Sequence, residues 1–313
     1  MKKFVVAVAV LAALGLAGFW LLTAPATWAM LRGDGNLAPR SVRSTENGRT
    51  MFYAGGCASC HASTGQDDKA KLGGGLGLHS PFGTFYVPNI SPHPRDGIGS
   101  WSQADFIRAM REGVSPDGSH YYPSFPYTSY QRMTPDDLAD LFAHIKTLPP
   151  VEGRVRDHAL PFPFNVRRSL GLWKLAFLDG QTFKPDAAKS AELNRGAYLV
   201  EGPGHCVECH SPRTFAGNIP AGSRFAGGPD PEGQGGFVPN ITPDASGLGA
   251  WSKGEIADLL KTGFTPEYDS VGGSMAAVIR NTSQLTDADR AAMADYLKSL
   301  PPRASPPKPK KGS

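Results

Sequence analysis

The stretch Cys57-Ala58-Ser59-Cys60-His61 recurs later in the chain as Cys206-Val207-Glu208-Cys209-His210. Both stretches have the pattern C-x-x-C-H, which is typical of a covalent c-type haem site. Two thiols at this spacing reach the two vinyl groups of one porphyrin, and the adjacent histidine becomes the proximal ligand of the iron. The sequence therefore predicts two covalently bound haem c groups. Their expected ligands are Cys57, Cys60 and His61 for the first haem, and Cys206, Cys209 and His210 for the second.

Two other uses of paired cysteines fit this pattern less well. A thioredoxin-like redox pair stands beside a βαβ pattern, and the sequence shows none. A zinc site brings its cysteine pairs within about 15–20 residues of each other. Here the pairs begin 149 positions apart, at Cys57 and Cys206, and each has its own histidine. We therefore expect haem at both positions.

The haem motifs belong to a longer internal repeat. Val-Pro-Asn-Ile-Ser-Pro at 87–92 matches Val-Pro-Asn-Ile-Thr-Pro at 238–243, and Gly-Ile-Gly-Ser-Trp-Ser at 97–102 matches Gly-Leu-Gly-Ala-Trp-Ser at 247–252. A repeat of this length indicates two tandem domains of one fold, because solenoid repeats have periods of about 20–50 residues. We expect Pro88 and Pro239, inside the first matched motif, to shape the loop beside each proximal histidine.

Helix signals recur in the same order in both halves and predict an all-α fold. A helix leads into each haem motif, over residues 45–60 and 195–209. A middle helix follows the N-cap residues Ser102 and Ser252, with a fuller capping box at the second. A last helix follows Thr134 and Thr286 and ends before a Leu-Pro-Pro sequence, where proline stops it. The pattern shows no convincing strand.

These signals divide the chain into five segments. We expect an anchor or signal segment at 1–30, a first haem domain at 43–150, a linker at 151–187, a second haem domain at 188–302 and a basic tail at 303–313. The linker contains an apolar and basic stretch that starts at Pro161. We expect it to pack across the two domains, in preference to docking on a partner or a membrane surface.

The N-terminal segment has the pattern of a membrane anchor. Met1-Lys2-Lys3 is followed by nineteen residues without a charge, Phe4–Leu22. The apolar region of a cleavable signal has about 7–15 residues and a membrane span about 20, so this length favours an anchor. A small-x-small site leaves cleavage after Ala26 open. Because lysines stay in the cytoplasm, we expect the inner membrane, with the haem domains facing the periplasm.

The net charge gives little support to nucleic-acid binding. The chain has a formal charge of +4, but six cations lie in its two end segments, and residues 4–302 carry −2 without them. A nucleic-acid-binding domain needs a basic patch on its folded surface. We therefore expect no nucleic-acid partner.

The second axial ligand of each iron is expected to differ between the halves. Methionine is a common sixth ligand in electron carriers and raises the potential. Met275 lies in a Gly-rich stretch between the middle and last helices of the second half and is the expected ligand there. Its counterpart in the first half is Phe125, which cannot bind iron. Met133 is the first alternative, His120 the second, and an open site the third.

Several motifs together resemble a known family. They are Gly-Gly-Cys-x-x-Cys-His at 55–61, Pro-Asn-Ile-Ser-Pro at 88–92, Gly-Ile-Gly-x-Trp-Ser at 97–102, Tyr-Pro-Ser-Phe-Pro-Tyr at 122–127 and Gly-x-Cys-x-x-Cys-His-Ser-Pro-Arg at 204–213. In this combination the halves resemble the cytochrome c subunits of periplasmic alcohol, aldehyde and gluconate dehydrogenases, over about 45–302. The resemblance implies two tandem cytochrome c domains in a membrane-bound electron carrier. Members commonly carry three haems, and many have methionine where Phe125 stands.

These features predict a dihaem cytochrome c that transfers electrons in the periplasm. Its donor would be a periplasmic dehydrogenase, and its acceptor a quinone, a small cytochrome or a terminal oxidase. No nucleophile, paired-carboxylate site or phosphate loop is apparent, which favours an electron-transfer protein or oxidoreductase subunit over a stand-alone enzyme. The alternative is a haem enzyme with an open or displaceable sixth site at the first haem, of the peroxidase or thiosulfate-oxidoreductase type.

Overall fold

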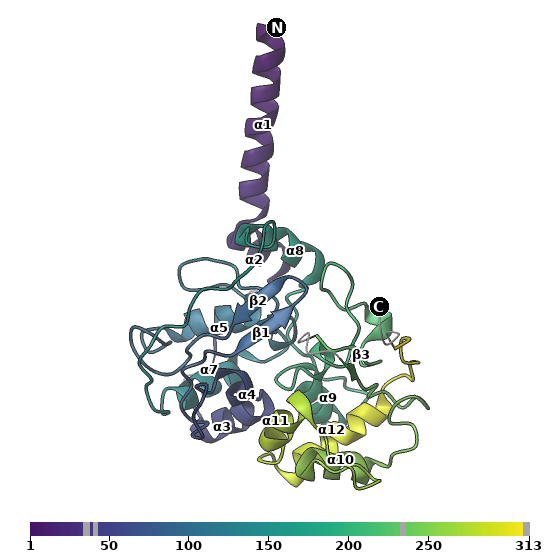
Figure 1. The fold of residues 1–313 in the computed structure, drawn as a ribbon. Coiled ribbons are helices and arrows are strands. Elements are labelled where there is room, and N and C mark those ends of the chain that lie inside the picture. The colour runs from purple at the N-terminus through teal and green to yellow at the C-terminus, as the bar shows by residue number, and fades with distance from the viewer. Residues whose placement is uncertain (34–37, 40–42, 232–235, 309–313) are drawn as a thin grey trace.

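The N-terminal segment forms a helix that projects from the body of the molecule (Figure 1). The computed structural model describes residues 1–33, 38–39, 43–231 and 236–308. Helix α1 spans Lys2–Leu22, and none of its residues is buried. It is long and apolar enough to cross a membrane, although a signal sequence near an N-terminus has the same character. Helix α2, Pro25–Arg32, follows directly and lies against the body.

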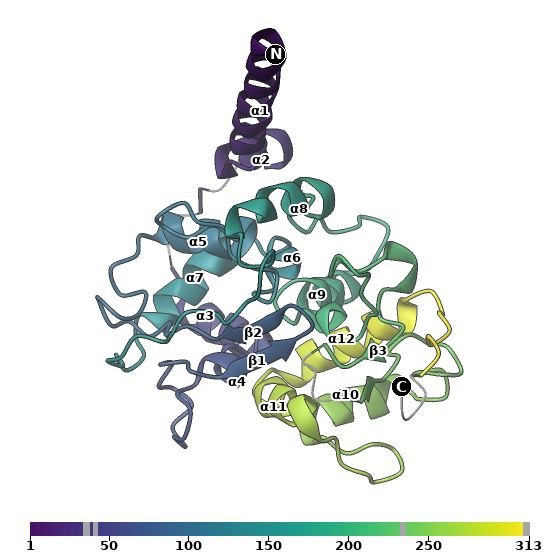
Figure 2. The ribbon, with the colours of Figure 1, turned by 45° about the horizontal axis from the view of Figure 1, so that its top comes forward.

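The two halves of the body have matching helices and lie side by side (Figure 2). The first half contains α3 (Thr45–Ala54), α4 (Cys57–His61), β1 (Gly77–Ser80), β2 (Gly83–Tyr86), α5 (Gln103–Glu112), α6 (Tyr127–Tyr130) and α7 (Pro135–Ile145). The second half contains α9 (Ala191–Glu201), η2 (Cys206–Glu208), η3 (Ala221–Ser223), β3 (Gly228–Pro229), β4 (Phe237–Val238), α10 (Lys253–Thr262), α11 (Gly273–Thr282) and α12 (Asp287–Ser299). Between them lie η1 (Arg167–Ser169) and α8 (Leu170–Phe177).

The predicted starts of the middle and last helices are confirmed in both halves, whereas the helix expected over 195–209 is α9, which begins at Ala191 and ends at Glu201. Ser102 and Ser252 each cap a middle helix, α5 and α10, with a complete capping box. The box at Ser102 uses Asp105 as fully as the other uses Glu255, so the expected difference between them is absent. Thr134 and Thr286 likewise cap α7 and α12 through their hydroxyl groups. Local capping chemistry therefore sets where these helices begin.

A glycine lets the first and last helices of each half cross closely. A Cβ atom on Gly48 of α3 would collide with the carbonyl oxygen of Asp140 in α7. A Cβ atom on Gly196 of α9 would collide in the same way with the carbonyl oxygen of Ala292 in α12. The two glycines occupy equivalent positions of the repeat, and at both crossings the helix backbones touch.

One hydrophobic core continues through both halves. It contains Met51, Ile107 and Leu138 from the first half together with Leu199 and Met293 from the second. If either half stood alone, the apolar side chains where the two halves meet would be exposed to water. The tandem domains thus form one packed body.

The all-α expectation is only partly correct. Two short antiparallel hairpins are present, β1 with β2 and β3 with β4. They lie in the Gly/Pro-rich loops that follow each haem motif, and they are too short to give a readable alternation of apolar residues. The helix expected over 45–60 is also interrupted: α3 ends at Ala54, and Gly56 takes a left-handed conformation before α4 begins.

The linker packs on both halves, as expected. The carboxylate of Asp179 pairs with the Arg132 guanidinium of the first half through two bonds, at 2.9 and 2.6 Å. The Phe183 ring packs on Tyr198 of the second half, with ring centres 5.6 Å apart. Helix α8 of the linker also contacts α2, since the Trp28 Nε1 donates to the carbonyl of Leu178, directly after α8, at 3.2 Å. The linker therefore also fixes the base of α1.

Candidate haem sites

The two cysteine-histidine motifs form short helical turns at equivalent places. Residues Cys57–His61 form α4, and Cys206–Glu208 form the 3-10 turn η2. All four cysteines are half-buried and free of disulfides. Burial raises the pKa of the Cys57 and Cys206 thiols to about 12. Four thiols beside two histidines are the donor set that two covalent haem groups require.

Each motif histidine has one ring nitrogen fixed by a backbone carbonyl. The His61 Nδ1 donates to the carbonyl of Pro88 at 2.9 Å, and the His210 Nδ1 donates to that of Pro239 at 2.7 Å. Burial lowers the pKa of His61 to about 4, with the Pro88 carbonyl opposing the shift, and burial also lowers the pKa of His210. Both rings are therefore neutral, with Nε2 left for iron. The expected place of Pro88 and Pro239 beside the histidines is confirmed.

Met275 lies in a helix and not in the loop that its glycines indicate. It occupies the first turn of α11, after Gly272 and Gly273, and is half-buried against the core. A Cβ atom on either glycine would meet open space, so the start of α11 can lie close to a large planar cofactor. Ligation of the second iron by Met275 remains a prediction.

Met133 is buried at the junction of the two halves. Only 1% of it is exposed, and its Cγ lies 3.7 Å from where a Cβ on Gly202 of the second half would stand. Its backbone follows α6 and directly precedes the cap of α7. Ligation of the first iron by Met133 likewise remains a prediction.

His120 is engaged elsewhere and does not suit the first iron. Its Nε2 donates to the carbonyl of Thr23 at 2.8 Å, and its Nδ1 accepts from the Lys174 ammonium at 3.0 Å. Neither nitrogen is left for iron. Burial, reinforced by the charge of Lys174, lowers the pKa of His120 to about 4. This histidine belongs to the contact between the N-terminal segment and the body.

Phe125 fills its position with aromatic packing. Its ring contacts those of Tyr121, Tyr127 and Tyr130, with ring centres 5.7 to 6.3 Å apart. The Tyr127 side chain is fully buried. This aromatic cluster lies at the position that α11 and Met275 occupy in the second half, so the two halves differ in structure at this point.

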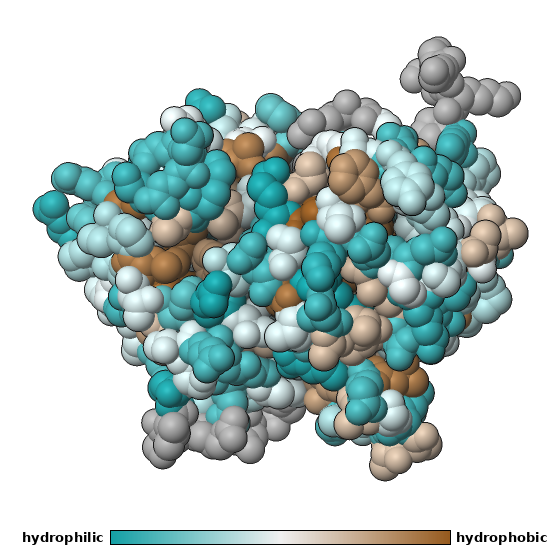
Figure 3. Space-filling model, turned by 90° about the horizontal axis from the view of Figure 1, so that it is seen from below, coloured by the Kyte–Doolittle hydropathy of each residue, from teal (hydrophilic) through white to brown (hydrophobic). Residues whose placement is uncertain are grey.

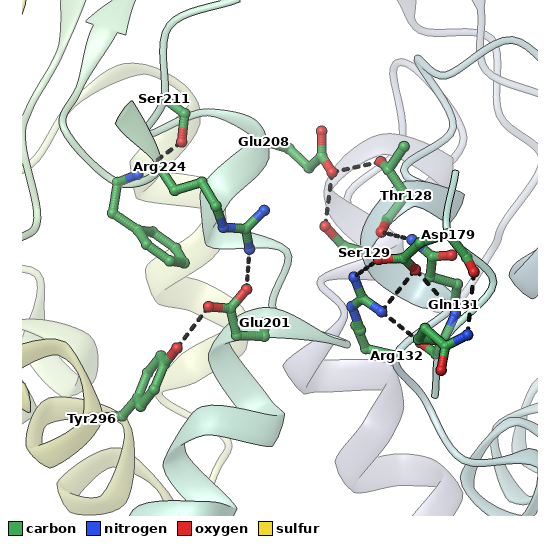
Figure 4. Close-up of polar contacts among 12 residues, drawn as sticks. Thr128, Ser129, Gln131, Arg132, Asp179, Glu201, Glu208, Ser211, Arg224 and Tyr296 are labelled. Carbon is green, nitrogen blue, oxygen red and sulfur yellow. Dashed lines mark hydrogen bonds and ion pairs between the residues drawn. The ribbon is translucent and has the colours of Figure 1, made fainter. Parts of the chain in front are cut away.

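Each half contacts the haem motif of the other half. Ser59 and Glu208 occupy the same position, between the two cysteines of their motifs. The Asn281 Nδ2 of α11 donates to the Ser59 Oγ at 2.9 Å. Reciprocally, the hydroxyls of Thr128 and Ser129 in α6 donate to Glu208 at 2.6 and 2.7 Å (Figure 4). The two halves therefore make reciprocal contacts: each one binds the haem motif of the other through its helix α6 or α11.

The residues before the two motifs touch directly. His205 takes the left-handed conformation, with φ 38°, at the position equivalent to Gly56. Its Nε2 donates to the carbonyl of Gly55 at 3.3 Å, and its ring packs edge-on against Tyr130. A histidine in this conformation is strained and needs such contacts to keep it. The two haem attachment segments therefore lie back to back.

Glu208 is a buried charge between the second pair of cysteines. Burial alone would raise its pKa, but the Arg213 guanidinium at 2.8 Å and the two α6 hydroxyls lower the pKa below its usual value. Arg213 also donates to the carbonyl of Gly217 at 2.8 Å. Arg213 thus makes a structural ion pair with Glu208.

The two motifs are evident in the sequence, but the contacts between them are not. Glu208 is 80 and 79 positions from its partners Thr128 and Ser129, and Asn281 is 222 positions from Ser59. One available signal was the acidic residue between Cys206 and Cys209, where the first motif has serine. A carboxylate in an apolar site needs a partner.

The comparisons with known proteins agree with the geometry. The sequence profile of the family described as Cytochrome c matches residues 45–149 and 193–301. A Cereibacter sphaeroides protein named "Diheme cytochrome c-type" is 50% identical over 289 residues, which are 92% of this chain and 94% of that protein.

Other relatives are subunits of dehydrogenases. The fructose dehydrogenase cytochrome subunit of Gluconobacter japonicus is 38% identical over 83% of this chain. The gluconate 2-dehydrogenase cytochrome c subunit of Pantoea cypripedii is 35% identical over 82%. The chain spans 53% and 59% of the lengths of these two relatives.

Proposed function

The chain belongs to the cytochrome c family and carries two covalently bound haem c groups, and we propose that it is a membrane-anchored relay that passes electrons between a periplasmic dehydrogenase and a further acceptor. The acceptor class is a quinone, a small cytochrome or a terminal oxidase. The observation that carries the proposal is the back-to-back placement of the two attachment segments. Two haems fixed so close together are suited to exchange electrons within one molecule.

The relay role requires little chemistry from the protein beyond binding and tuning. Haem supplies the one-electron chemistry when bound. The chain supplies the neutral His61 and His210 rings, fixed by the Pro88 and Pro239 carbonyls, and a packed body that keeps the two sites at a constant separation. It also supplies the sixth ligands, for which we propose Met275 at the second iron and Met133 at the first.

The dehydrogenase partner can be identified by its substrate. Membranes from cells with and without this chain would receive an alcohol, a sugar or a sugar acid, and reduction of the haem c bands would be recorded. We expect at least one substrate to reduce bands that vanish with the chain. If every substrate leaves these bands oxidised, a role downstream of such a dehydrogenase is wrong.

The contacts at the base of α1 support a retained anchor in the inner membrane. Thr23 and Trp28 lie on either side of the possible cleavage site after Ala26, and both are buried against the body. Cleavage would leave the His120 ring without the Thr23 carbonyl that it contacts. Mass spectrometry of the mature holoprotein should find residues before Thr23. A chain starting at Thr27 would exclude the anchor.

The relatives favour an electron carrier over a haem enzyme, since those described above are cytochromes or cytochrome subunits. Carbon monoxide separates the two roles. We expect both reduced haems to bind it slowly or not at all. Rapid binding at one haem would indicate an open or displaceable sixth site, as an enzyme needs.

A further inference from the structure

Helix α8 has its polar and apolar faces reversed. Its one charged residue, Lys174, is fully buried, and its Nζ donates to the carbonyls of Glu112 and Gly113 at 2.6 Å each. Leu172, Ala176 and Phe177 face outward instead, and 43% of both Leu172 and Phe177 is exposed. A helix on a water-facing surface has the opposite arrangement. The outer face of α8 is therefore built for an apolar or interfacial surrounding.

The apolar surface continues on both sides of α8. The segment before it exposes Phe162 (79%) and, to a smaller extent, Phe164 and Val166. A neighbouring loop exposes Phe215 almost completely, at 97%, and is attached to α8 because the Trp173 Nε1 donates to the carbonyl of Ala216 at 2.8 Å. Single exposed apolar residues are normal on proteins, but such a group indicates an interaction surface.

This surface begins where α1 ends. A Cβ on Gly171 of α8 would lie 2.6 Å from the Thr23 Cα, so the two backbones touch one residue beyond α1. The Arg168 guanidinium lies 3.8 Å from the ring centre of Trp20, in the last turn of α1, and donates to its carbonyl at 2.7 Å. Tryptophan and arginine at the end of an apolar helix mark the membrane–water boundary. In a membrane crossed by α1, helix α8 would therefore lie at the depth of the lipid headgroups.

The opposite face of the body has a different character. Figure 3 views the molecule from the side turned away from α1 and shows hydrophilic residues surrounding separate hydrophobic patches. In Figures 1 and 2, α2 and α8 lie at the base of α1. The reversed helix is thus on the side where a membrane crossed by α1 would lie.

We propose that α8, with the exposed segment 162–166 and Phe215, forms a second membrane contact that lies in the headgroup region of the phospholipid bilayer crossed by α1. The proposal rests on the proposed anchoring by α1. Continuity with α1 favours lipid over a protein as the occupant. With two contacts, the haem body would keep one orientation toward the membrane, and the Lys174 and His120 bonds would keep α8 and the end of α1 together.

An introduced cysteine can report the surroundings of α8. All four native cysteines are used by haem, so Ala176→Cys would add the one free thiol of the holoprotein. Ala250→Cys, at an exposed alanine before α10, is the matched control. Each variant would be placed in vesicles of phosphatidylethanolamine and phosphatidylglycerol and treated with a charged, membrane-impermeant maleimide. We expect the thiol at 176 to react about tenfold more slowly, because an apolar surrounding disfavours the thiolate.

Further measurements assign the cause. Adding Leu172→Glu and Phe177→Glu should raise the rate at 176 to that of the control, and a photoreactive phospholipid should label the peptide containing residues 170–177. Equal rates at 176 and 250 without these substitutions would overturn the proposal. So would slow reaction without lipid labelling, which means that protein covers the helix. Extraction at alkaline pH tests α1 separately: release of the protein contradicts the anchor, whereas retention with a fast-reacting thiol at 176 contradicts only the α8 contact.

Discussion

Met275 is the residue whose proposed role is most open to spectroscopy. If its sulfur binds the second iron, Met275→Ala should remove the methionine–ferric-haem charge-transfer band of that haem. The potential should fall by on the order of a hundred millivolts, within the roughly 0.8 V over which axial ligands act. Met293→Leu, at a buried core position in α12, is the control and should change neither property. An unchanged band in Met275→Ala would remove it as the ligand.

Glu208 tests the buried charge at the contact between the halves. Glu208→Gln removes the ion pair with Arg213 while keeping the shape of the side chain. We expect the free energy of unfolding to fall by about 1–3 kcal/mol, because a partly buried guanidinium loses its partner. Asp295→Asn breaks the exposed ion pair with Lys253 and should cost less than about 1 kcal/mol. Denaturant unfolding would compare them, and equal losses would show that the Glu208 pair is no more than a surface pair.

For single residues, the sequence predicts the chemistry that depends on partners a few positions away in the chain. The haem cysteines, their histidines and the cap residues Ser102 and Thr134 are legible because their partners lie within a few positions. His120 misleads because its partners, Thr23 and Lys174, are 97 and 54 positions away. No local pattern distinguishes a ligand from such a structural histidine.

The helix crossings can be tested with glycine substitutions. Gly48→Ala and Gly196→Ala each place a methyl group against a facing backbone carbonyl, which cannot move aside without separating the helices. We expect each to lower the free energy of unfolding by about 1–3 kcal/mol or more. Gly254→Ala in α10 has only a side-chain oxygen nearby, at 3.9 Å, and should be neutral or stabilising by up to about 1 kcal/mol. If all three variants behave alike, the close crossings are not what the glycines serve.

The buried Lys174 of helix α8 should make the free energy of unfolding depend on pH. Burial lowers the pKa of Lys174 from 10.5 to about 7, with Glu112 opposing the shift. Between pH 7 and 10.5 the unfolded chain then binds a proton that the folded one lacks, so stability rises with pH, by up to about 1.4 kcal/mol per unit. His120 and the nearby Tyr127 ring stay neutral over pH 7–10, since burial lowers the pKa of the first and raises that of the second.

Lys174→Met supplies the comparison for this pH dependence. The stability difference between wild type and this variant should shift in favour of wild type from pH 6.5 to pH 9, measured by denaturant unfolding. Parallel pH profiles of the two proteins would contradict this expectation. They would show that the Lys174 ammonium keeps its proton in the folded state, where it contacts three acceptors.

Among the elements, the helices whose cap residues are evident in the sequence are predictable, and the elements without such a signal are not. Helices α5, α7, α10 and α12 begin where their cap residues indicate. Helix α11 reads as a loop, because Gly272 and Gly273 at its start suggest continued turn structure. The two-residue strands β3 and β4 form through a pairing that their own sequence does not reveal.

For the whole molecule, the repeat predicts two similar units but not how they pack. The repeated motif pairs give the order of helices in each half, whereas the contact uses positions where the halves differ. Serine stands opposite glutamate at 59 and 208, and glycine opposite histidine at 56 and 205. A comparison of the two halves finds the residues that they share, so it does not identify contact residues that differ between them. These residues make the surroundings of the two haem motifs unequal.

Exchange of electrons between the two haems of one chain can be observed by pulse reduction. Fully oxidised holoprotein would receive less than one electron per molecule in a rapid pulse, and both haems would be followed at wavelengths that separate them. We expect a redistribution between the haems whose first-order rate does not change with protein concentration. A rate proportional to protein concentration, or no redistribution at all, would contradict it.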